Sequence, residues 1–279
     1  MSGPEDRRTI AALTIAGSDS SGGAGIQADL KTFMAMGVYG ASAITALTAQ
    51  NTMGVSDIHL VPPSHIEAQI DAVLSDLRVG AIKTGMLGGE AQIEAVAESL
   101  GDEARHIPLV VDPVMVATSG ARLLERGAEQ ALVSRLVPLA HLITPNLGEA
   151  AALLGVPMAQ DEAQAQAQAR DLMQLGCKAV LVKGGHFSGR EAQDFYFDGV
   201  ELRRFARPRV ETRNTHGTGC TLASAIAAGL AQGRPTPHAI DAAKDFVHRA
   251  LLAGQELNIG RGAGPLDHAG AMANRVGQG

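Results

Sequence analysis

The sequence predicts an α/β protein with a mainly parallel sheet that is covered by helices on both faces. Short apolar runs alternate along the chain with segments in which apolar residues recur at helical spacing. Strands joined by helices in this way form parallel sheets, because a parallel neighbour is reached only through a crossover connection. One later segment breaks the alternation, and it predicts an antiparallel hairpin at an edge of the sheet.

Six apolar runs are the expected strands. They cover residues 10–16, 41–47, 79–83, 109–112, 142–144 and 179–183. A helical pattern that includes Ile66 and Ile70 follows the capping-box signature of Ser64 and Glu67. Asp161 likewise suits the start of an exposed helix through the Ala- and Gln-rich residues 160–170.

The expected hairpin covers residues 194–205, where two strand-like runs flank the turn dipeptide Asp198-Gly199. In an open α/β sheet, ligands bind beyond the carboxyl ends of the strands. The segments that carry candidate functional residues follow strand-like runs, and we therefore expect them to share one cleft.

The composition excludes several classes of protein. Hydrophobic residues make up 46% and charged residues 19%, which is ordinary for a globular chain, and the net charge of −6 argues against a nucleic-acid partner. Two cysteines, Cys177 and Cys220, provide no disulfide framework. The start of the chain lacks the apolar core of a signal peptide, and no apolar run is long enough for a membrane span. We expect a reduced, cytoplasmic protein.

Residues 214–220, Asn-Thr-His-Gly-Thr-Gly-Cys, are the most informative stretch, and a long apolar helix follows them at once. The unpaired amides and the positive dipole end of a helix start attract anions, so Gly217, Thr218 and Gly219 are expected to bind phosphate. Cys220 lies in the same field, and its thiol is expected to ionise more easily than that of a free cysteine. A glycine-rich helix start with a buried, unreactive cysteine is the alternative interpretation.

Residues 17–25, Gly-Ser-Asp-Ser-Ser-Gly-Gly-Ala-Gly, join the first strand to the first helix. They lack the ending of a P-loop and the spacing of a dinucleotide fingerprint. Their glycines would let a small ligand approach the backbone, although a tight strand-to-helix turn explains them equally well. Gln50 ends the second apolar run, and its amide both donates and accepts hydrogen bonds, as the edge of a heteroaromatic ring requires. Taken singly, a surface amide is the simpler interpretation.

Two lysines stand at the ends of expected strands. Lys183 precedes Gly184-Gly185, which places an ammonium beside flexible backbone at the carboxyl edge of the sheet, where phosphate could bind. Lys83 occupies a similar strand end. Lys244 lies within the last long helix, where a solvated surface charge is the default expectation.

Asn146 and Glu149 lie where a strand gives way to a helix. They could hold Mg²⁺ through water, because Mg²⁺ keeps several waters and takes few protein ligands. An N-cap at Asn146 with Glu149 in the first helical turn explains the pair equally well. Asp112 is a further candidate near the metal. The histidines do not cluster at metal-ligand spacings, and His216 is notable only for its place in the expected anion site.

Six segments of the sequence, taken together and in this order, point to one known family. They are residues 13–32, 45–51, 112–115, 143–146, 182–186 and 214–220. Together they resemble the hydroxymethylpyrimidine/phosphomethylpyrimidine kinases of thiamine biosynthesis, in the ribokinase superfamily, and the similarity runs from about Ala12 to Pro265. The resemblance implies one ribokinase-like domain over residues 1–279, a three-layer α/β/α sandwich, with flexible tails at 1–9 and 267–279.

The resemblance also implies an activity: ATP-dependent phosphorylation of 4-amino-5-hydroxymethyl-2-methylpyrimidine to its monophosphate and then to its diphosphate, by a homodimer. Cys220 takes the place of the catalytic aspartate of many ribokinase relatives. The implied pyrimidine site consists of Gln50, Gly17, Asp29, Met86 and Val114. The implied phosphate and metal positions are Lys183, Lys244 and Asn146 for ATP, and Glu149 and Asp112 for Mg²⁺, largely through water. The need for a monovalent cation stays open, as do the lid contacts of Thr118, where some relatives carry lysine.

A pyridoxal or pyridoxine kinase of the same superfamily is the nearest alternative, because pyridoxine also presents a hydroxymethyl group on a nitrogen heteroaromatic ring. A cysteine-using subgroup of these kinases has a second cysteine in its lid, and residues 112–120 contain none, which favours the pyrimidine. A non-catalytic nucleotide- or pyrimidine-binding protein is the alternative of another class. Cys220, Lys183 and Glu149 argue against it, since a pure binding protein has no use for a base.

Overall fold

The structure is a computed structural model, and it describes residues 8–101, 106–117, 120–125, 127–185, 187 and 189–276. Thr118, for which the sequence leaves the lid contacts open, lies outside the described residues. Within them, no helix has both the length and the apolar character needed to cross a membrane.

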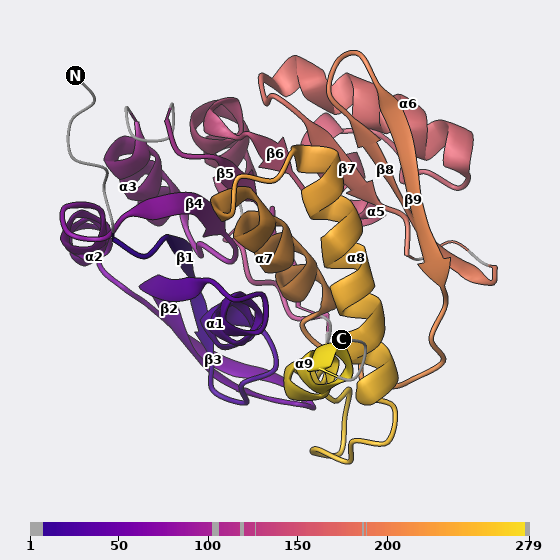
Figure 1. The fold of residues 1–279 in the computed structure, drawn as a ribbon. Coiled ribbons are helices and arrows are strands. Elements are labelled where there is room, and N and C mark those ends of the chain that lie inside the picture. Colours follow the sequence, from indigo (N-terminus) through magenta and orange to yellow (C-terminus); the bar gives the residue numbers. More distant parts are fainter. Residues whose placement is uncertain are drawn as a thin grey trace, which may run out of the picture.

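Nine strands of the described chain form one sheet in the order β3-β2-β1-β4-β5-β6-β7-β8-β9 (Figure 1). They are β1 (Ala11–Asp19), β2 (Tyr39–Asn51), β3 (Gly54–Leu60), β4 (Val79–Thr84), β5 (Leu109–Val111), β6 (Leu142–Ile143), β7 (Val180–Lys183), β8 (Glu191–Phe197) and β9 (Leu202–Pro208). The pairings from β2 through β7 are parallel, and those of β3, β8 and β9 are antiparallel. The six predicted strands and the mainly parallel sheet are confirmed.

The predicted hairpin is also confirmed, and β9 forms one edge of the sheet. Asp198-Gly199 lies in the connection between the two strands, and Gly199 has the positive φ of 92° that favours glycine. The Asp198 carboxylate accepts hydrogen bonds from the amides of Val200 and Glu201, at 3.0 and 2.7 Å. The turn is therefore held by the Asp198 side chain as well as by the pairing of β8 with β9.

The opposite edge strand, β3, was not predicted. Its residues Gly54–Leu60 are half-buried or exposed along most of their length, so they lack the continuous apolar run of the inner strands. β3 pairs antiparallel with β2, and the sheet consequently has antiparallel strands at both edges.

Helices cover both faces of the sheet in two layers (Figure 1). One layer contains α1 (Gly25–Ala35), α7 (Thr218–Ala231), α8 (Thr236–Ala253) and α9 (His268–Val276). The other contains α2 (Pro63–Leu74), α3 (Glu90–Leu100), α4 (Ala128–Ala131), α5 (Leu147–Leu154) and α6 (Glu162–Leu172), with the short η2 (Leu132–Leu136), η3 (Val137–Leu139) and η4 (Met173–Leu175). Successive β1 residues contribute to the two cores in turn, with Ala12 toward α1 and Leu13 toward α2. This is the expected three-layer sandwich.

The predicted helix starts have different outcomes. Asp161 caps α6, because its side chain accepts from the Gln164 amide at 2.8 Å. The predicted capping box of Ser64 and Glu67 is wrong, since α2 begins at Pro63, one residue before the serine. Proline suits that first helical position because its missing N–H has no intrahelical acceptor there.

The C-terminal segment also differs from the expected flexible tail at 267–279. Residues His268–Val276 form α9, which packs against α8 and α1. Ala271 is fully buried, and the His268 ring shares a 2.9 Å hydrogen bond with the Thr221 hydroxyl. The apolar side of this short helix therefore belongs to the core of its layer.

Candidate active site

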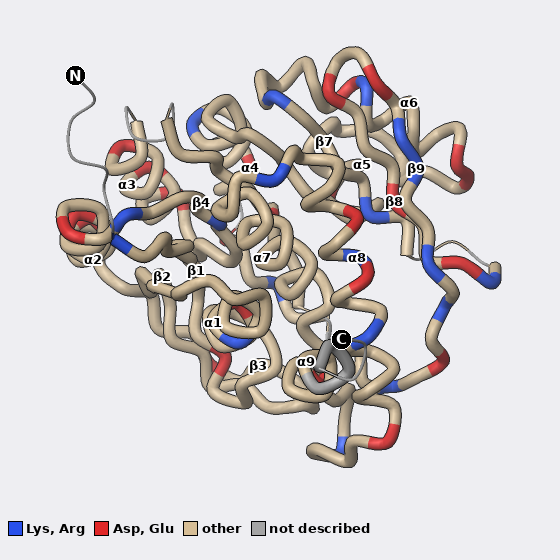
Figure 2. Tube along the Cα trace, viewed as in Figure 1, with Lys and Arg blue, Asp and Glu red and all other residues tan. Residues whose placement is uncertain are grey.

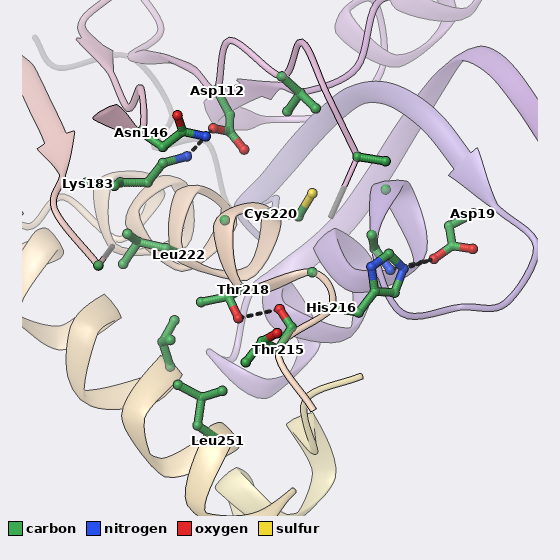
Figure 3. A pocket seen from close by; sticks show the side chains of 18 of the residues that line it. Asp19, Asp112, Asn146, Lys183, Thr215, His216, Thr218, Cys220, Leu222 and Leu251 are labelled. Carbon is green, nitrogen blue, oxygen red and sulfur yellow. Dashed lines mark hydrogen bonds and ion pairs between the residues drawn. The ribbon is translucent and has the colours of Figure 1, made fainter. Parts of the chain in front are cut away.

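A cavity of about 670 Å³ opens at the carboxyl ends of the parallel strands, a size that suits a small-molecule site. Every predicted site residue except Asp29 lines it. These residues are Gly17, Gln50, Met86, Val114, Asp112, Asn146, Glu149, Lys183, Gly217, Thr218, Gly219, Cys220 and Lys244. The fold therefore brings segments that are far apart in the sequence to one cleft (Figure 3).

Two helix starts meet at this cavity. α7 begins at Thr218 after Gly217, whose φ of 85° is left-handed, and α1 begins at Gly25. A Cβ added at Gly217 would collide with the carbonyl oxygen of Gly23. The positive dipole ends of both helices therefore face the same space.

Asp19 holds the glycine-rich turn and the anion segment together. Its Oδ2 accepts from the amides of Gly23 and Ala24 at 3.0 and 2.8 Å, and from His216 Nε2 at 2.9 Å (Figure 3). Its Oδ1 accepts from the amide and the hydroxyl of Ser21. Burial opposes ionisation, but hydrogen bonds from His216 and Ser21 outweigh it and hold the pKa of Asp19 well below its usual range. The glycines permit the tight turn between β1 and α1, and the Asp19 carboxylate holds the turn in this geometry.

The Cys220 side chain is partly exposed and lines the cavity, and the Gly25 backbone favours its thiolate form. The prediction that this thiol ionises more easily than a free cysteine is wrong. Burial raises its pKa to about 11, and the nearby Lys83 ammonium opposes the rise without overcoming it. Loss of water therefore outweighs the helix dipole at this position.

Asp29 lies beneath the cavity wall and does not reach the cavity. Its side chain is fully buried and forms an ion pair with Lys83 at 2.9 Å. It also accepts hydrogen bonds from the hydroxyls of Thr14 and Ser224, at 2.6 and 2.5 Å. Burial opposes the charge of Lys83, but the Asp29 carboxylate prevails and holds the pKa of Lys83 above its usual range. Asp29 therefore does not make the expected contact with substrate. It instead binds Ser224, which lies one helical turn after Cys220 on α7, and so supports the helix that carries the thiol.

Lys183 lies between two carboxylates at another part of the cavity. Its Nζ is 2.8 Å from Asp112 Oδ1 and 3.8 Å from Glu149 Oε2. Burial raises the pKa of Glu149 to about 7; Lys183 opposes this rise, and Asp112 adds to it. Burial would lower the pKa of Lys183, but the two carboxylates hold it above its usual range.

Asn146 and Glu149 form a capping box at the start of α5. Asn146 Oδ1 accepts from the Glu149 amide at 2.8 Å, and Glu149 Oε2 accepts from the Asn146 amide at 2.7 Å. The interpretation of this pair as a helix cap is therefore confirmed. The cap also fixes the Glu149 carboxylate at the cavity edge, where Lys183 lies. Among the described side chains, no group of three or more His, Cys, Asp and Glu residues could hold a metal ion.

Lys244 is buried, which corrects the default expectation of a solvated charge. Its Nζ forms a 2.6 Å ion pair with Asp194 Oδ2 of β8, and Asp194 Oδ1 accepts from the Gly184 amide. Arg207 of β9 ties the hairpin to the same helix through Asp241 and Asp245 of α8, and Figure 2 shows charges of both signs in this region. The hairpin therefore positions Lys244 at the cavity.

The comparisons with known proteins agree with this geometry. The family model of phosphomethylpyrimidine kinase matches residues 19–267. The chain belongs to this family. It is 55% identical over 260 residues to the hydroxymethylpyrimidine/phosphomethylpyrimidine kinase of Rhizobium meliloti (strain 1021), covering 93% of this chain and 97% of the relative.

Two solved structures confirm the fold of this family member. The ADP complex of Bacillus subtilis pyridoxal kinase has a TM-score of 0.85 at 36% identity, covering 94% of this chain and 98% of that one. The phosphomethylpyrimidine kinase of Clostridium difficile 630 has a TM-score of 0.77 at 41% identity, covering 87% and 100%. The predicted resemblance and the ribokinase-like fold are thereby confirmed.

Sequence reasoning missed an apolar part of the cavity in this phosphomethylpyrimidine kinase family member. Its lining includes Pro208, Val210, Leu222, Val247 and Leu251. One signal was available, because Lys244, Val247, His248 and Leu251 recur at the spacing of one helix face. Arg209 was also missed; it lines the cavity and donates to the carbonyls of Gly185 and Phe187, at 2.8 and 2.6 Å.

Proposed function

We propose that this chain transfers the γ-phosphoryl group of ATP to the hydroxymethyl group of 4-amino-5-hydroxymethyl-2-methylpyrimidine, and then phosphorylates the monophosphate to the diphosphate, as thiamine biosynthesis requires. The convergence of two helix starts beside Cys220 on one cavity carries the proposal. Phosphoryl transfer demands positioning and charge stabilisation more than covalent chemistry. Amides at helix starts supply such stabilisation without any change in net charge.

The pyrimidine ring is assigned to the part of the cavity that contains Gly17, Met86, Val114 and Gln50. Gly17 donates to the Met86 carbonyl at 3.0 Å, and a Cβ at Gly17 would lie 3.0 Å from the Met86 sulfur. A side chain at position 17 would therefore narrow the space for a flat ring. Gln50 supplies the donor and the acceptor that a pyrimidine edge needs.

The nucleotide is assigned to the other part, where the base would lie against the apolar surface of Val210, Leu222 and Leu251. The phosphates would then extend past Lys244 and Asn146 toward Lys183 and the start of α7. Lys183 Nζ lies close to the start of α7, because a Cβ built at Gly219 would be 3.3 Å from it. This proximity supports contact of Lys183 and the α7 amides with the same phosphoryl group. Each lysine is held by a carboxylate, with Asp194 on Lys244 and Asp112 on Lys183.

In the first transfer, Cys220 accepts the proton of the alcohol, while the amides of Gly217, Gly219 and Cys220 stabilise the moving phosphoryl group. The Thr218 amide donates to the Thr215 carbonyl at 3.2 Å, so Thr218 contributes by holding the turn. Because burial keeps the thiol largely protonated at neutral pH, the thiolate is a minor form that Lys83 and the Gly25 backbone stabilise. A general base contributes about 10²–10⁴-fold, and we place Cys220 toward the lower end. The second transfer begins from a phosphate that is already largely ionised, so its need for a base is smaller.

Asp112 and Glu149 fit a magnesium site that is bound largely through water. Both carboxylates line the cavity, and the charge of Asp112 helps to raise the pKa of Glu149. Oxygen ligands from one or two carboxylates, with the substrate phosphates, are the usual set for Mg²⁺. When bound, Mg²⁺ would neutralise charge on the triphosphate. The homodimer, the cytoplasmic location and the open question of a monovalent cation remain parts of the proposal.

The first test is whether ADP release by the purified protein depends on the pyrimidine. ATP and Mg²⁺ are supplied with and without the alcohol to the wild type, to Cys220→Ala and to Cys177→Ala, the last being the matched control for loss of a thiol away from the cavity. We expect release only with the alcohol, both in the wild type and in Cys177→Ala. Pyrimidine binding without ADP release would instead identify a non-catalytic binding protein.

A pyridoxal kinase is the second candidate, since a solved pyridoxal kinase is similar to this chain over 94% of its length. Pyridoxal and the pyrimidine alcohol are compared in one assay by kcat/KM. We expect the pyrimidine to be preferred, because residues 112–120 contain no second cysteine. A preference for pyridoxal would replace the proposed substrate while keeping the phosphoryl transfer.

A further inference from the structure

The Gln50 side-chain amide lies between Thr48 and His216, and the other hydrogen bonds of these two residues show where each of them carries its proton. In the structure, Gln50 Oε1 is 3.1 Å from the Thr48 hydroxyl, and Gln50 Nε2 is 3.4 Å from His216 Nε2. The oxygen and nitrogen of an amide have the same shape, so their placement is assigned from their partners. Each partner therefore tests which way the amide points.

Thr48 has one hydroxyl proton, and a backbone carbonyl requires it. Thr48 Oγ1 lies 2.8 Å from the Ser18 carbonyl oxygen, which can only accept. Toward Gln50, the hydroxyl oxygen is consequently left as an acceptor. The Gln50 atom that faces Thr48 should therefore be the amide nitrogen, with Oε1 and Nε2 exchanged.

His216 leads to the same conclusion independently. Its Nε2 lies 2.9 Å from Asp19 Oδ2, an oxygen that already accepts from the amides of Gly23 and Ala24 (Figure 3). Because this carboxylate only accepts, His216 Nε2 must carry a proton that points at it. A protonated Nε2 has no lone pair for an amide N–H, so the Gln50 atom that faces it should be the oxygen.

We propose that Thr48, His216 and Asp19 fix the orientation of the Gln50 amide, and that this fixed amide makes the site select a 4-aminopyrimidine over its 4-oxo analogue. Thr48 and His216 are positioning residues, and Asp19 acts through His216. The proposal rests on the proposed function for the identity of the ring, and it explains how one side chain selects among related rings.

Selectivity follows because the two rings present opposite patterns. A 4-aminopyrimidine offers a ring nitrogen that accepts beside an exocyclic N–H that donates. The 4-oxo form offers a ring N–H that donates beside an oxygen that accepts. The ring cannot turn over to compensate, because its hydroxymethyl group must reach Cys220. Accepting the 4-oxo form therefore requires the Gln50 amide to exchange its two ends, which breaks its contacts with Thr48 and His216.

The test compares kcat/KM for the 4-amino alcohol and its 4-oxo analogue in one assay. We expect the wild type to prefer the amino form by about 10²-fold or more, because a mismatched edge leaves buried polar groups unpaired. Thr48→Val and His216→Phe should each lower this ratio by about 10-fold, and Thr48→Ser, which keeps the hydroxyl, should restore it. Ser20→Ala is the matched control, since Ser20 binds the Gln50 backbone and not its amide, and it should leave the ratio unchanged.

Two kinetic results would overturn the proposal. One is a wild-type ratio near one. The other is a parallel fall in kcat/KM for both rings in Thr48→Val and His216→Phe with the ratio preserved, which is the signature of a merely structural role.

A measurement on the ligand-free protein separates this proposal from the proposed function. Nitrogen-15 NMR of the His216 ring reports directly whether Nε2 carries the proton. A protonated Nε2 supports the fixed amide, whereas an Nε2 lone pair overturns it, because Gln50 could then donate to the ring. A wild type that phosphorylates neither ring would contradict the proposed function, and the NMR result would still decide the orientation.

Discussion

The cavity is held by hydrogen bonds at its Gln50 end and by ion pairs at its Lys183 end. Near Gln50, one carboxylate, Asp19, gathers backbone amides and His216, and tightly packed glycines leave no room for side chains. Near Lys183, the ammonium groups of Lys183 and Lys244 are each paired with a carboxylate, and a bound phosphate would compete with that carboxylate for the ammonium. The first end is preorganised for shape and hydrogen-bond pattern, and the second holds charges ready to be exchanged.

Because of this difference, substitutions at the two ends should change different kinetic quantities. Loss of a hydrogen bond at the Gln50 end should change which substrate is accepted. Loss of a charge at the Lys183 end should change how tightly phosphates bind. Between the two ends, the junction of α1 and α7 beside Cys220 should control the chemical step itself.

The largest effect is expected where the two helix starts meet. In Gly217→Ala, the new methyl group would collide with the Gly23 carbonyl, and the left-handed φ of 85° would be strained. Since one preset anion donor is worth roughly 10²–10³-fold and several would shift together, we expect kcat to fall by about 10³-fold or more. Turnover measurements check this, with folding verified by circular dichroism.

Gly155→Ala is the matched control for that substitution. Gly155 also has a positive φ, of 67°, but an added Cβ would have no neighbour within 4 Å. It should lose about 1–2 kcal/mol of unfolding free energy and keep its turnover. Equal losses of turnover in the two variants would show that backbone strain alone, and not the junction, is responsible.

The next effect concerns the thiol. Cys220→Ala should lower the rate of the first transfer by about 10²-fold, because the proton acceptor is lost. The second transfer should fall less, since its acceptor is already ionised, and ATP affinity should not change. Single-turnover rates for each transfer and ATP titration provide the comparison. Wild-type turnover of the alcohol by Cys220→Ala would eliminate the base assignment.

A smaller effect is expected at Lys244, where a charge contributes to phosphate binding. Lys244→Met removes the ammonium that pairs with Asp194, so the KM for ATP should rise by about 10-fold with kcat less affected. The exposed Lys178→Met is the matched control and should behave as the wild type. An unchanged KM for ATP in Lys244→Met would remove Lys244 from the nucleotide site.

The smallest effect is the pH dependence of stability from Glu149. Its pKa in the folded chain is raised from 4.5 to about 7, so the folded state binds more protons than the unfolded state between these values. Its contribution is therefore fully present below about pH 4.5, and the unfolding free energy should fall by about 2–3 kcal/mol as the pH rises through 7. Urea denaturation at pH 5 and pH 7.5 measures the fall.

Glu149→Gln is the control for this titration, because glutamine keeps the acceptor of the capping box without an ionisable group. We expect a smaller loss of unfolding free energy between the two pH values than in the wild type. The same loss in both proteins would assign the pH dependence to other groups.

The sequence predicted the sheet and the positions around the cavity because both depend on local patterns. Lys183, Asp112 and Gln50 were found because strand ends in a parallel sheet meet at one edge. The strand β3 was missed because an exposed edge strand carries a weak apolar signal. The predicted start of α2 was wrong because Ser64 matched a capping pattern, whereas the helix begins at Pro63.

What the sequence could not give is the balance of burial against charge. A helix start predicts a more acidic thiol at Cys220, but the opposite shift depends on how completely the neighbouring segments exclude water. Asp29 and Lys244 show the same limit, because their partners Lys83 and Asp194 come from distant parts of the chain. Pairing of this kind depends on tertiary structure, which no local pattern reports.

Product analysis decides whether this cavity transfers two phosphoryl groups to the pyrimidine alcohol. The purified protein is given 4-amino-5-hydroxymethyl-2-methylpyrimidine, ATP and Mg²⁺, and the pyrimidine is followed by mass spectrometry over time. We expect the monophosphate to appear first and the diphosphate after it, each with one equivalent of ADP. Unchanged pyrimidine, with full binding of both substrates, would contradict the claim that this cavity transfers a phosphoryl group to that alcohol.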